Sequence, residues 1–305
     1  MPCAHSLYPS ILVYTSSEGR RVDITNANLA RLAPGDYLND SLIDFGLNHW
    51  MDGLRTQQPD LAKNIHVFSS FFYTRLCKLD ATEPVNCGRG YQAVKNWTSN
   101  IDIFNKRYLV VPLHKSLHWY LAIVYEPARI LHQAAAGSSL KPPTYIFTFD
   151  SLGRPHPEAG ETLGLYLRSE AEDKKRVVAP LSRSICQFAE VPTQPNSCDC
   201  GLYVLHFARR FMMNPNDIVN YITVRTPQGN DNDCRLVLNQ YWDPLAIQDA
   251  RGELKNLVLE ESAIWKSKQR PGRERTAREH REEGVGRSAG DCRATAINID
   301  SDSDL

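Results

Sequence analysis

The segment from Gln194 to Gly201 constrains this chain most, because it places a cysteine directly before an apolar helical run. It reads Gln-Pro-Asn-Ser-Cys-Asp-Cys-Gly, and the residues after it are apolar on nearly every side. The N-terminus of a helix favours the thiolate, because its unpaired N–H groups attract negative charge. We therefore expect Cys200 to be a nucleophile at the N-terminus of a helix that is buried nearly all round.

The neighbours of this cysteine fit the same chemistry. Gln194 lies six positions before Cys200, and its side-chain N–H can donate to the oxyanion that forms when a thiolate attacks a carbonyl. Gly201 has no Cβ, so a substrate backbone can come close to the thiol. Cys198 is not followed by a glycine, and we interpret it as a structural or bystander thiol.

A thiol nucleophile also needs a base, and the base needs a side chain that orients it. The run 117–124 is rich in β-branched and aromatic residues, which predicts a strand with His118 at its start. A second predicted strand, 144–149, ends at Asp150 and is followed by a Ser-Leu-Gly turn. We expect His118 to take the proton of Cys200, and Asp150 to hold the His118 ring in the right tautomer.

The other histidines have no such motif around them. His114 precedes no tryptophan, and we expect it to lie on the preceding strand or in the turn, out of reach of the thiol. A lone histidine is usually solvated or satisfied by its surroundings. We interpret the following residues in this way: His49, His66, His114, His132, His156 and His206.

The chain resembles the Ulp-type SUMO proteases, also called sentrin-specific proteases. The resemblance rests on the catalytic signature of that family, found here as His118-Trp119, Asp150-Ser151-Leu152-Gly153 and Gln194 with Asp199-Cys200-Gly201. Three further segments, 38–45, 68–73 and 93–97, are similar to the start of the family's first long helix and to its middle elements. Within the family, the middle segments are most similar to the branch that trims poly-SUMO chains.

The resemblance runs from about Ile11 to about Ala263 and has one departure inside the signature. The family usually has Gly-Ser before its Asp-Cys-Gly, whereas Ser197-Cys198 stands there in this chain. The gap between His118 and Asp150 is also longer than in the shortest members, because of an insertion at 126–143. Its composition predicts an extended hairpin loop that adds nothing to the core.

The resemblance implies an α+β, papain-like fold with a central mixed or antiparallel sheet. It implies a cysteine isopeptidase or endopeptidase that cleaves after the C-terminal Gly-Gly of SUMO, with SUMO and SUMO-conjugated proteins as partners and no metal or organic cofactor. Gln194 and the backbone N–H of Cys200 would bind the oxyanion, and Trp119 would roof a tunnel for the Gly-Gly tail. Asp40 matches a residue that contacts SUMO in the family, but it would serve equally well as a helix cap.

Two alternatives stay open at this point. The first is another acyl-transfer enzyme on the same scaffold, either a protease for a different ubiquitin-like protein such as Nedd8 or an acetyltransferase. The second is a catalytically silent SUMO-binding module, which would lack a member of the triad. None of the three residues is missing here.

The pattern predicts a protease domain over 1–268, with a last helix from Leu254 to Lys268, and a disordered tail over 269–305. The tail is dense in Arg, Glu and Gly and has no apolar period. Its end, Ile297 to Asp304, resembles a SUMO-interacting motif that would bind a second SUMO by adding a strand. A merely solvated acidic end is the equal alternative.

Composition favours an intracellular protein of the nucleus or cytoplasm. Lys plus Arg number 35 and Asp plus Glu also 35, so net charge favours neither nucleic acid nor membrane as a partner. No apolar run reaches the length of a membrane span, and the N-terminus shows no secretory signal pattern. The eight cysteines form no paired C-x-x-C sets, which argues against a zinc site. The size of the chain and its cysteine density argue against a secreted disulfide scaffold.

Overall fold

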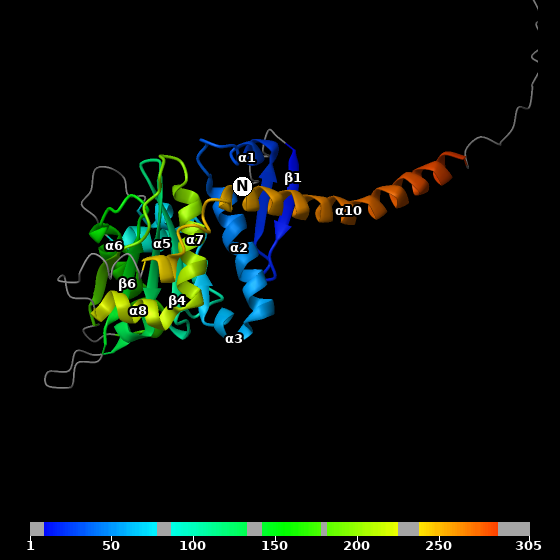
Figure 1. Cartoon of the computed structure of the whole chain (residues 1–305). Helices are drawn as coiled ribbons and strands as arrows, with labels where there is room; N and C mark the ends of the chain where they lie inside the picture. The colour runs from blue at the N-terminus through cyan, green and yellow to red at the C-terminus, as the bar shows by residue number, and fades with distance from the viewer. Residues whose placement is uncertain (1–8, 78–86, 133–141, 178–181, 225–237, 286–305) are drawn as a thin grey trace, which may run out of the picture.

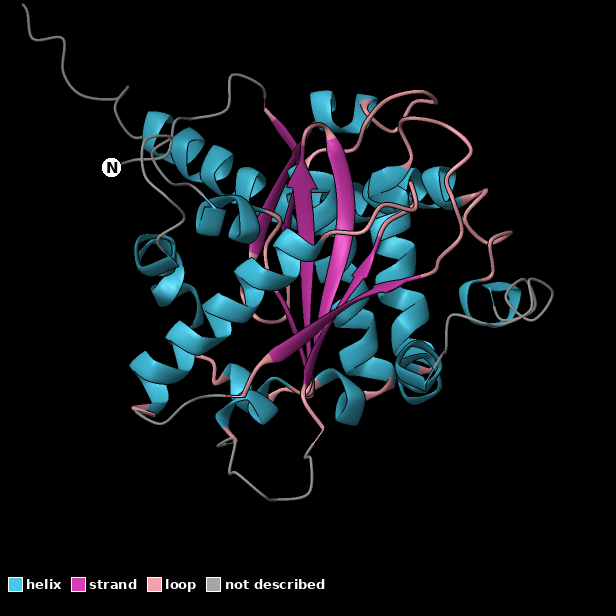
Figure 2. Cartoon of the chain, turned by 90° about the vertical axis from the view of Figure 1, so that its left-hand side faces the viewer, coloured by secondary structure: helices cyan, strands magenta, loops and turns pink. Residues whose placement is uncertain are grey.

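The computed structural model describes residues 9–77, 87–132, 142–177, 182–224 and 238–285 (Figure 1). At its centre lies a five-stranded sheet with helices on both sides (Figure 2). Its strands follow the order β3-β4-β5-β6-β7. The two outer pairings are parallel and the two inner ones antiparallel. The predicted α+β class with a mixed central sheet is therefore confirmed. The strands span Ile65–Val67, Tyr108–Lys115, His118–Tyr125, Thr144–Phe149 and Ser184–Ala189.

The two faces of the sheet support two hydrophobic cores. On the central strand β5, the odd-numbered residues from Trp119 to Tyr125 belong to one core and the even-numbered residues from Tyr120 to Val124 to the other. This alternation follows from the two-residue period of a strand. The first core includes side chains of α2 (Asp40–Gln57) and α7 (Cys200–Met213), and the second those of α4 (Phe71–Cys77) and α6 (Pro157–Lys175).

The remaining elements surround these layers. An N-terminal antiparallel hairpin, β1 (Ser10–Thr15) and β2 (Arg21–Thr25), packs against α10 (Ala250–Val285) and α2. The short helices are α1 (Asn26–Ala30), α3 (Pro59–Ala62), α5 (Cys87–Val94), α8 (Pro215–Val224), the 3₁₀ turns η1 (Lys95–Thr98), η2 (Ile103–Asn105) and η3 (Pro127–Leu131), and the π turn η4 (Leu238–Trp242). Of the helices in the described residues, none is long and apolar enough to cross a membrane.

The insertion at 126–143 differs from its prediction. It connects the antiparallel strands β5 and β6, but its first part folds into η3 and buries the side chain of Ile130 completely in the second core. The backbone carbonyl of Ile130 also accepts a hydrogen bond from the N–H of Ser182 at 3.1 Å. This part of the insertion is therefore core, because one isoleucine among loop residues finds an apolar site. Residues 133–141 lie outside the described ranges.

The last helix also differs from its prediction. A helix from Leu254 to Lys268 and disorder from 269 onward were expected, whereas α10 begins at Ala250 and continues to Val285 (Figure 1). The predicted disorder therefore does not hold for 269–285. Arg and Glu are strong helix formers, and a helix whose first turns are already packed grows without a new nucleation step. The predicted SUMO-interacting motif, 297–304, lies outside the described residues.

Candidate active site

The predicted nucleophile occupies the first position of a buried helix. Cys200 opens α7, and Asp199 is the residue that caps it from the N-terminal side. The side chain of Cys200 is 1% exposed, and most of α7 behind it is buried in the first core. The thiol therefore lies at the positive end of the helix dipole and is shielded from bulk water.

Two neighbouring strands bring the predicted base and its orienter together. His118 opens β5, and Asp150 follows the last residue of β6, which is the antiparallel neighbour of β5. The Nε2 atom of His118 lies 2.7 Å from Oδ1 of Asp150, whose side chain is fully buried. A carboxylate can only accept, so this Nε2 carries the proton. The Nδ1 atom is therefore the ring nitrogen left for the thiol of Cys200, which lies near enough to raise the pKa of His118.

Hydrogen bonds favour the charged forms of His118 and Asp150, although burial disfavours them. Burial alone would raise the pKa of Asp150, but the hydrogen bonds from His118, His156 and the N–H of Leu152 hold it well below its usual range. Burial would likewise lower the pKa of His118, but the hydrogen bond with Asp150 and the neighbouring Cys200 raise it to about 9. An imidazolium beside Cys200 favours the thiolate, which is the form that attacks carbonyls.

Gln194 is fixed from both ends of its amide. Its Oε1 accepts from the hydroxyl of Ser151 at 2.6 Å, and its Nε2 donates to the carbonyl of Asn196 at 2.5 Å. These contacts orient the NH₂ group toward the nucleophile loop and use one of its two hydrogens. Within the described residues the second hydrogen has no partner, and binding of the oxyanion by Gln194 stays a prediction.

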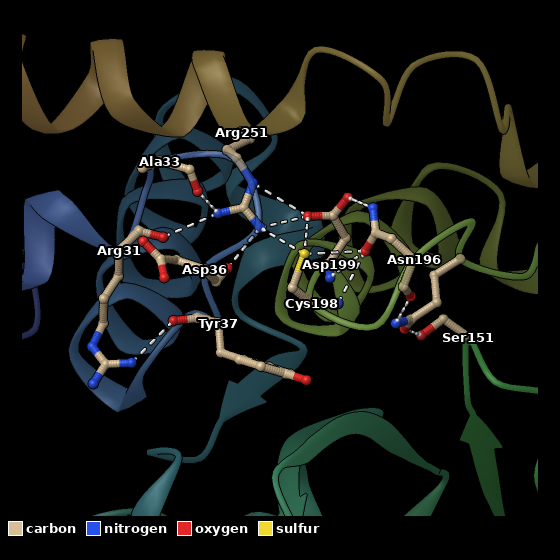
Figure 3. Close-up of polar contacts among 10 residues, drawn as sticks. Arg31, Ala33, Asp36, Tyr37, Ser151, Asn196, Cys198, Asp199 and Arg251 are labelled. Atoms are coloured by element: carbon tan, nitrogen blue, oxygen red, sulfur yellow. Dashed lines mark hydrogen bonds and ion pairs between the residues drawn. The ribbon is translucent and has the colours of Figure 1, made fainter.

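The loop before Cys200 is built around a single asparagine. The Oδ1 atom of Asn196 accepts from the backbone N–H groups of Cys198 and Asp199, both at 3.0 Å, and its Nδ2 donates to the carboxylate of Asp199 at 2.7 Å (Figure 3). The thiol of Cys198 lies 3.2 Å from the same Oδ1, and its side chain is 5% exposed. Burial raises the pKa of Cys198, so this thiol is held as a neutral part of the loop.

Arg251, which lies 52 positions after Asp199, also binds to the loop before Cys200. Its guanidinium contacts the carboxylate of Asp199 and donates to the carbonyls of Arg31, Ala33 and Asp36 (Figure 3). Sequence reasoning did not find this residue. It stands at the start of the last helix with no motif around it, and only the fold brings it to the nucleophile loop.

Trp119 and Gly201 are both in contact with the segment 38–43. The indole Nε1 of Trp119 donates to the carbonyl of Leu38 at 3.0 Å, and the ring is 2% exposed. A Cβ added to Gly201 would meet the Cβ of Leu38 at 2.9 Å and Ile43 at 3.1 Å. The missing Cβ thus makes room for Leu38 and Ile43 of the same chain, and the close approach of a substrate backbone at Gly201 stays a prediction. A tunnel roof at Trp119 stays a prediction.

The structure also settles smaller points. Asn39 caps α2, with its side chain accepting from the N–H of Leu42, while Asp40 is the first helical residue and is half-buried. Capping is thus not the role of Asp40, and a contact with substrate stays a prediction.

His114 lies on β4 opposite Trp119, with 4.6 Å between the two ring centroids.

His156 is a second residue of the site that sequence reasoning missed. It was interpreted as an ordinary histidine, but its Nε2 lies 2.6 Å from Oδ2 of Asp150. The six-residue separation from Asp150 matches no motif, so the sequence carries no signal for this contact.

A thiol at a helix N-terminus, with a histidine and a buried carboxylate on adjacent strands of an α+β sheet, is the arrangement typical of papain-like cysteine proteases. Residues 36–233 match the model of the Ulp1 protease family, C-terminal catalytic domain, and the chain belongs to that family. The predicted family membership is confirmed.

Individual relatives agree with this assignment. The chain is 33% identical over 280 residues to ubiquitin-like-specific protease 2 of Schizosaccharomyces pombe, which covers 85% of this chain and 43% of that protein. It is 28% identical over 295 residues to sentrin-specific protease 7 of Homo sapiens, covering 77% of this chain and 26% of that protein. The chain thus spans less than half the length of these relatives.

Solved structures show the same fold. A crystal structure of a de-sumoylating protease superposes with a TM-score of 0.73 at 28% identity and covers 87% of this chain and 96% of that one. The C-terminal Ulp1 protease domain, solved in complex with Smt3, the yeast ortholog of SUMO, has a TM-score of 0.50 at 20% identity. It covers 85% of this chain and 90% of that one, and at this identity it supports the fold alone.

Proposed function

We propose that this chain is a cysteine isopeptidase that cleaves after the C-terminal Gly-Gly of SUMO and so removes SUMO from proteins. The observation that carries the proposal is the pairing of His118 with Asp150 at 2.7 Å, beside a Cys200 that raises the pKa of the same histidine. The similarity to ubiquitin-like-specific and sentrin-specific proteases supports the substrate class.

The proposed reaction follows from the positions of these side chains. The thiolate of Cys200 attacks the carbonyl carbon of the terminal glycine, and the electron pair of the C=O bond moves to its oxygen. The free N–H of Gln194 and the backbone N–H of Cys200 bind that oxyanion. His118 then gives its proton to the leaving lysine amine as the C–N bond breaks. A water molecule that passes its proton to His118 hydrolyses the remaining thioester.

The surface around the site suits a protein substrate. Three large apolar side chains are exposed beside it: Tyr37 at 39%, Leu117 at 76% and Leu152 at 38%. They are direct sequence neighbours of Leu38, His118 and Ser151, so each lies next to a residue of the site. Exposed apolar side chains grouped in this way are typical of interaction surfaces. We propose that they contact SUMO together with Asp40. We also propose that the 38–43 segment, which is in contact with both Trp119 and Gly201, binds the narrow Gly-Gly tail.

A panel of C-terminal electrophilic probes built on SUMO, Nedd8 and ubiquitin tests this proposal on the intact chain. The SUMO probe should form a covalent adduct with the wild type and with Cys198→Ser, and none with Cys200→Ser. Cys200→Ser should still bind SUMO, because only the attacking atom changes. Preferential labelling by Nedd8, or labelling of Cys198 in the wild type, would contradict the proposal. An acetyltransferase or a silent binding module would form no adduct with any probe.

The tail motif carries a second, finer proposal. We propose that Ile297 to Asp304 bind a second SUMO, because the segment combines β-branched residues with acidic ones that suit strand addition. A second site on the same chain acts through effective concentration, so it needs a second SUMO within reach. Truncation after Val285 should therefore slow the cleavage of poly-SUMO chains and leave a mono-SUMO substrate unaffected. Equal chain-cleavage rates would remove this proposal and leave the protease assignment in place.

A further inference from the structure

The carboxylate of Asp150 is bound from both sides. Its Oδ1 accepts from His118 at 2.7 Å and from the N–H of Leu152 at 2.7 Å, while its Oδ2 accepts from His156 at 2.6 Å. The side chain of Asp150 has no exposure to solvent. Within the described part of the chain, His156 is the one partner recorded for Oδ2.

The fold fixes the ring of His156 in this position. His156 is the residue before the first turn of α6, where Pro157 takes a position that requires no N–H donor. Its ring lies parallel to that of Tyr120, with 3.8 Å between the centroids and 12° between the planes. Tyr120 lies on β5 two residues after His118, so the strand that carries the base also supports the second histidine.

The proton on His156 can be assigned from its partners. An ionised carboxylate can only accept, so Nε2 of His156 donates to Asp150. The other nitrogen, Nδ1, faces Oε1 of Glu158 at 3.6 Å, and this carboxylate is itself paired with Lys115 at 3.2 Å. Asp150 and Glu158 are thus the charged groups recorded against the ring.

We propose that His156 is a positioning residue for the reaction, one that holds the Asp150 carboxylate so that Oδ1 stays aligned with His118. A carboxylate held at one oxygen can rotate about its Cβ–Cγ bond, whereas a second bond at the other oxygen fixes the plane of the group. Without His156, a buried anionic oxygen would also lose its partner. The inference rests on the proposed catalytic roles of His118 and Asp150.

Two substitutions separate this role from simple packing. His156→Phe keeps a ring that can stack on Tyr120 but removes the donor, whereas His156→Gln loses the ring and places an amide N–H near the former Nε2. The matched control is His49→Phe, since His49 also contacts a carboxylate, that of Glu261 at 3.4 Å, and the rings of Tyr14 and Phe45. Thermal unfolding of each full-length variant shows whether it is folded before its kinetics are compared.

Turnover of a fluorogenic SUMO substrate gives the decisive comparison. In His156→Phe, kcat should fall by roughly tenfold to a hundredfold, the rate equivalent of one hydrogen bond to a charged group, with KM unchanged. His156→Gln should recover most of kcat, and His49→Phe should match the wild type. A wild-type kcat in His156→Phe, or a His156→Gln variant as slow as His156→Phe, would overturn the proposal.

A second readout needs no substrate and separates the two proposals. Alkylation of Cys200 by iodoacetamide at neutral pH reports how much thiolate the histidine supports. The rate should fall in His156→Phe and return in His156→Gln, and identical rates in all three proteins would overturn the positioning role. A wild type that is alkylated at Cys200 but cleaves no SUMO substrate would contradict the proposed function and leave the alkylation test of His156 standing.

Discussion

Arg251 forms an ion pair with Asp199, the residue directly before the nucleophile, with 2.5 Å between its Nη2 and Oδ1 of the carboxylate. The two residues lie 52 positions apart, and the same guanidinium also donates to the carbonyls of Arg31 and Asp36 (Figure 3). The first turn of α10 thus fastens the loop before Cys200 to the loop before Leu38. These loops flank the 38–43 segment, which is in contact with both Trp119 and Gly201, so α10 supports the site through Arg251 and Asp199.

Replacing Arg251 by Ala should impair both stability and turnover. The side chain of Asp199 would keep a partly buried charge with one partner fewer, which should cost about 1–3 kcal/mol of the free energy of unfolding. The loop that positions Cys200 would also loosen, so kcat should fall. Arg251→Lys should not restore either property, because an ammonium cannot reproduce the planar fork of donors.

Arg210 provides the control for this variant. It lies on α7, donates to the backbone carbonyls of Tyr241 and Gln240, and pairs with Asp243 at 3.8 Å. Among the described residues, none of these partners belongs to the nucleophile loop. Arg210→Ala should therefore lower the melting temperature while leaving kcat near the wild-type value. Equal losses of kcat in Arg210→Ala and Arg251→Ala, measured below both melting temperatures, would show that general destabilisation explains the effect.

Replacing Asp150 by Asn should lower kcat by as much as roughly 10⁴-fold without unfolding the protein. Asp150 accepts from two histidine N–H groups, one at each oxygen, whereas an asparagine offers one acceptor and turns its NH₂ group toward the other ring. One histidine would then have to adopt the other tautomer. Steady-state kinetics with a thermal unfolding curve measure this effect, and a variant with near-native kcat would exclude Asp150 as the orienting residue.

The pH dependence of kcat/KM should show an alkaline limb near 9. The pKa of His118 is raised to about 9 from an ordinary value of 6.5, so the imidazolium that protonates the leaving amine is lost as the pH rises through about 9. The same shift makes a contribution to folding stability that is complete below about 6.5 and disappears as the pH rises through about 9.

A pH series of kcat/KM on a fluorogenic SUMO substrate locates this limb. Parallel urea unfolding of the wild type and of His118→Gln should give a stability difference that shrinks as the pH rises from 6.5 to 9. A decline of activity centred near 6.5, or a stability difference independent of pH, would contradict a raised pKa of His118.

The sequence predicted those elements whose structure depends on residues close together along the chain. The run 117–124 has strand composition and His118 opens β5, and an apolar helix follows Cys200 in α7, so both catalytic candidates lie on the predicted elements. The family resemblance rested on short motifs in the family's order, among them the spacing from Gln194 to Cys200. These features are readable because each depends on neighbours within a few residues along the chain.

The parts that the sequence could not indicate depend on long-range packing. Arg251 reaches Asp199 only because α10 returns to the nucleophile loop, and no residue near Arg251 marks that contact. His156 becomes part of the site because the turn after Asp150 brings its ring onto Tyr120, a contact between separate elements. The extension of α10 to Val285 was missed because a sequence without apolar period resembles disorder, even where its residues favour a helix.

Replacing Gly201 by Ala should damage the site through Leu38. The new Cβ would lie 2.9 Å from the Cβ of Leu38, which is part of the residue's rigid stem, so the 38–43 segment would have to move. Overpacking of this kind costs about 1–3 kcal/mol of the free energy of unfolding, and it should disturb the hydrogen bond from Trp119 to Leu38. We expect KM for SUMO to rise, because this segment is proposed to bind the Gly-Gly tail.

Gly53 on α2 is the matched control for Gly201, because a Cβ there would meet no atom within 4 Å. Gly53→Ala should stabilise the protein by about 0.5–1 kcal/mol, the usual gain in a helix interior, with unchanged kinetics. Urea unfolding and steady-state kinetics on both variants test the pair. A Gly201→Ala variant with native stability and native KM would show that Leu38 can give way without consequence, and that the close approach of α7 to the 38–43 segment does not shape the site.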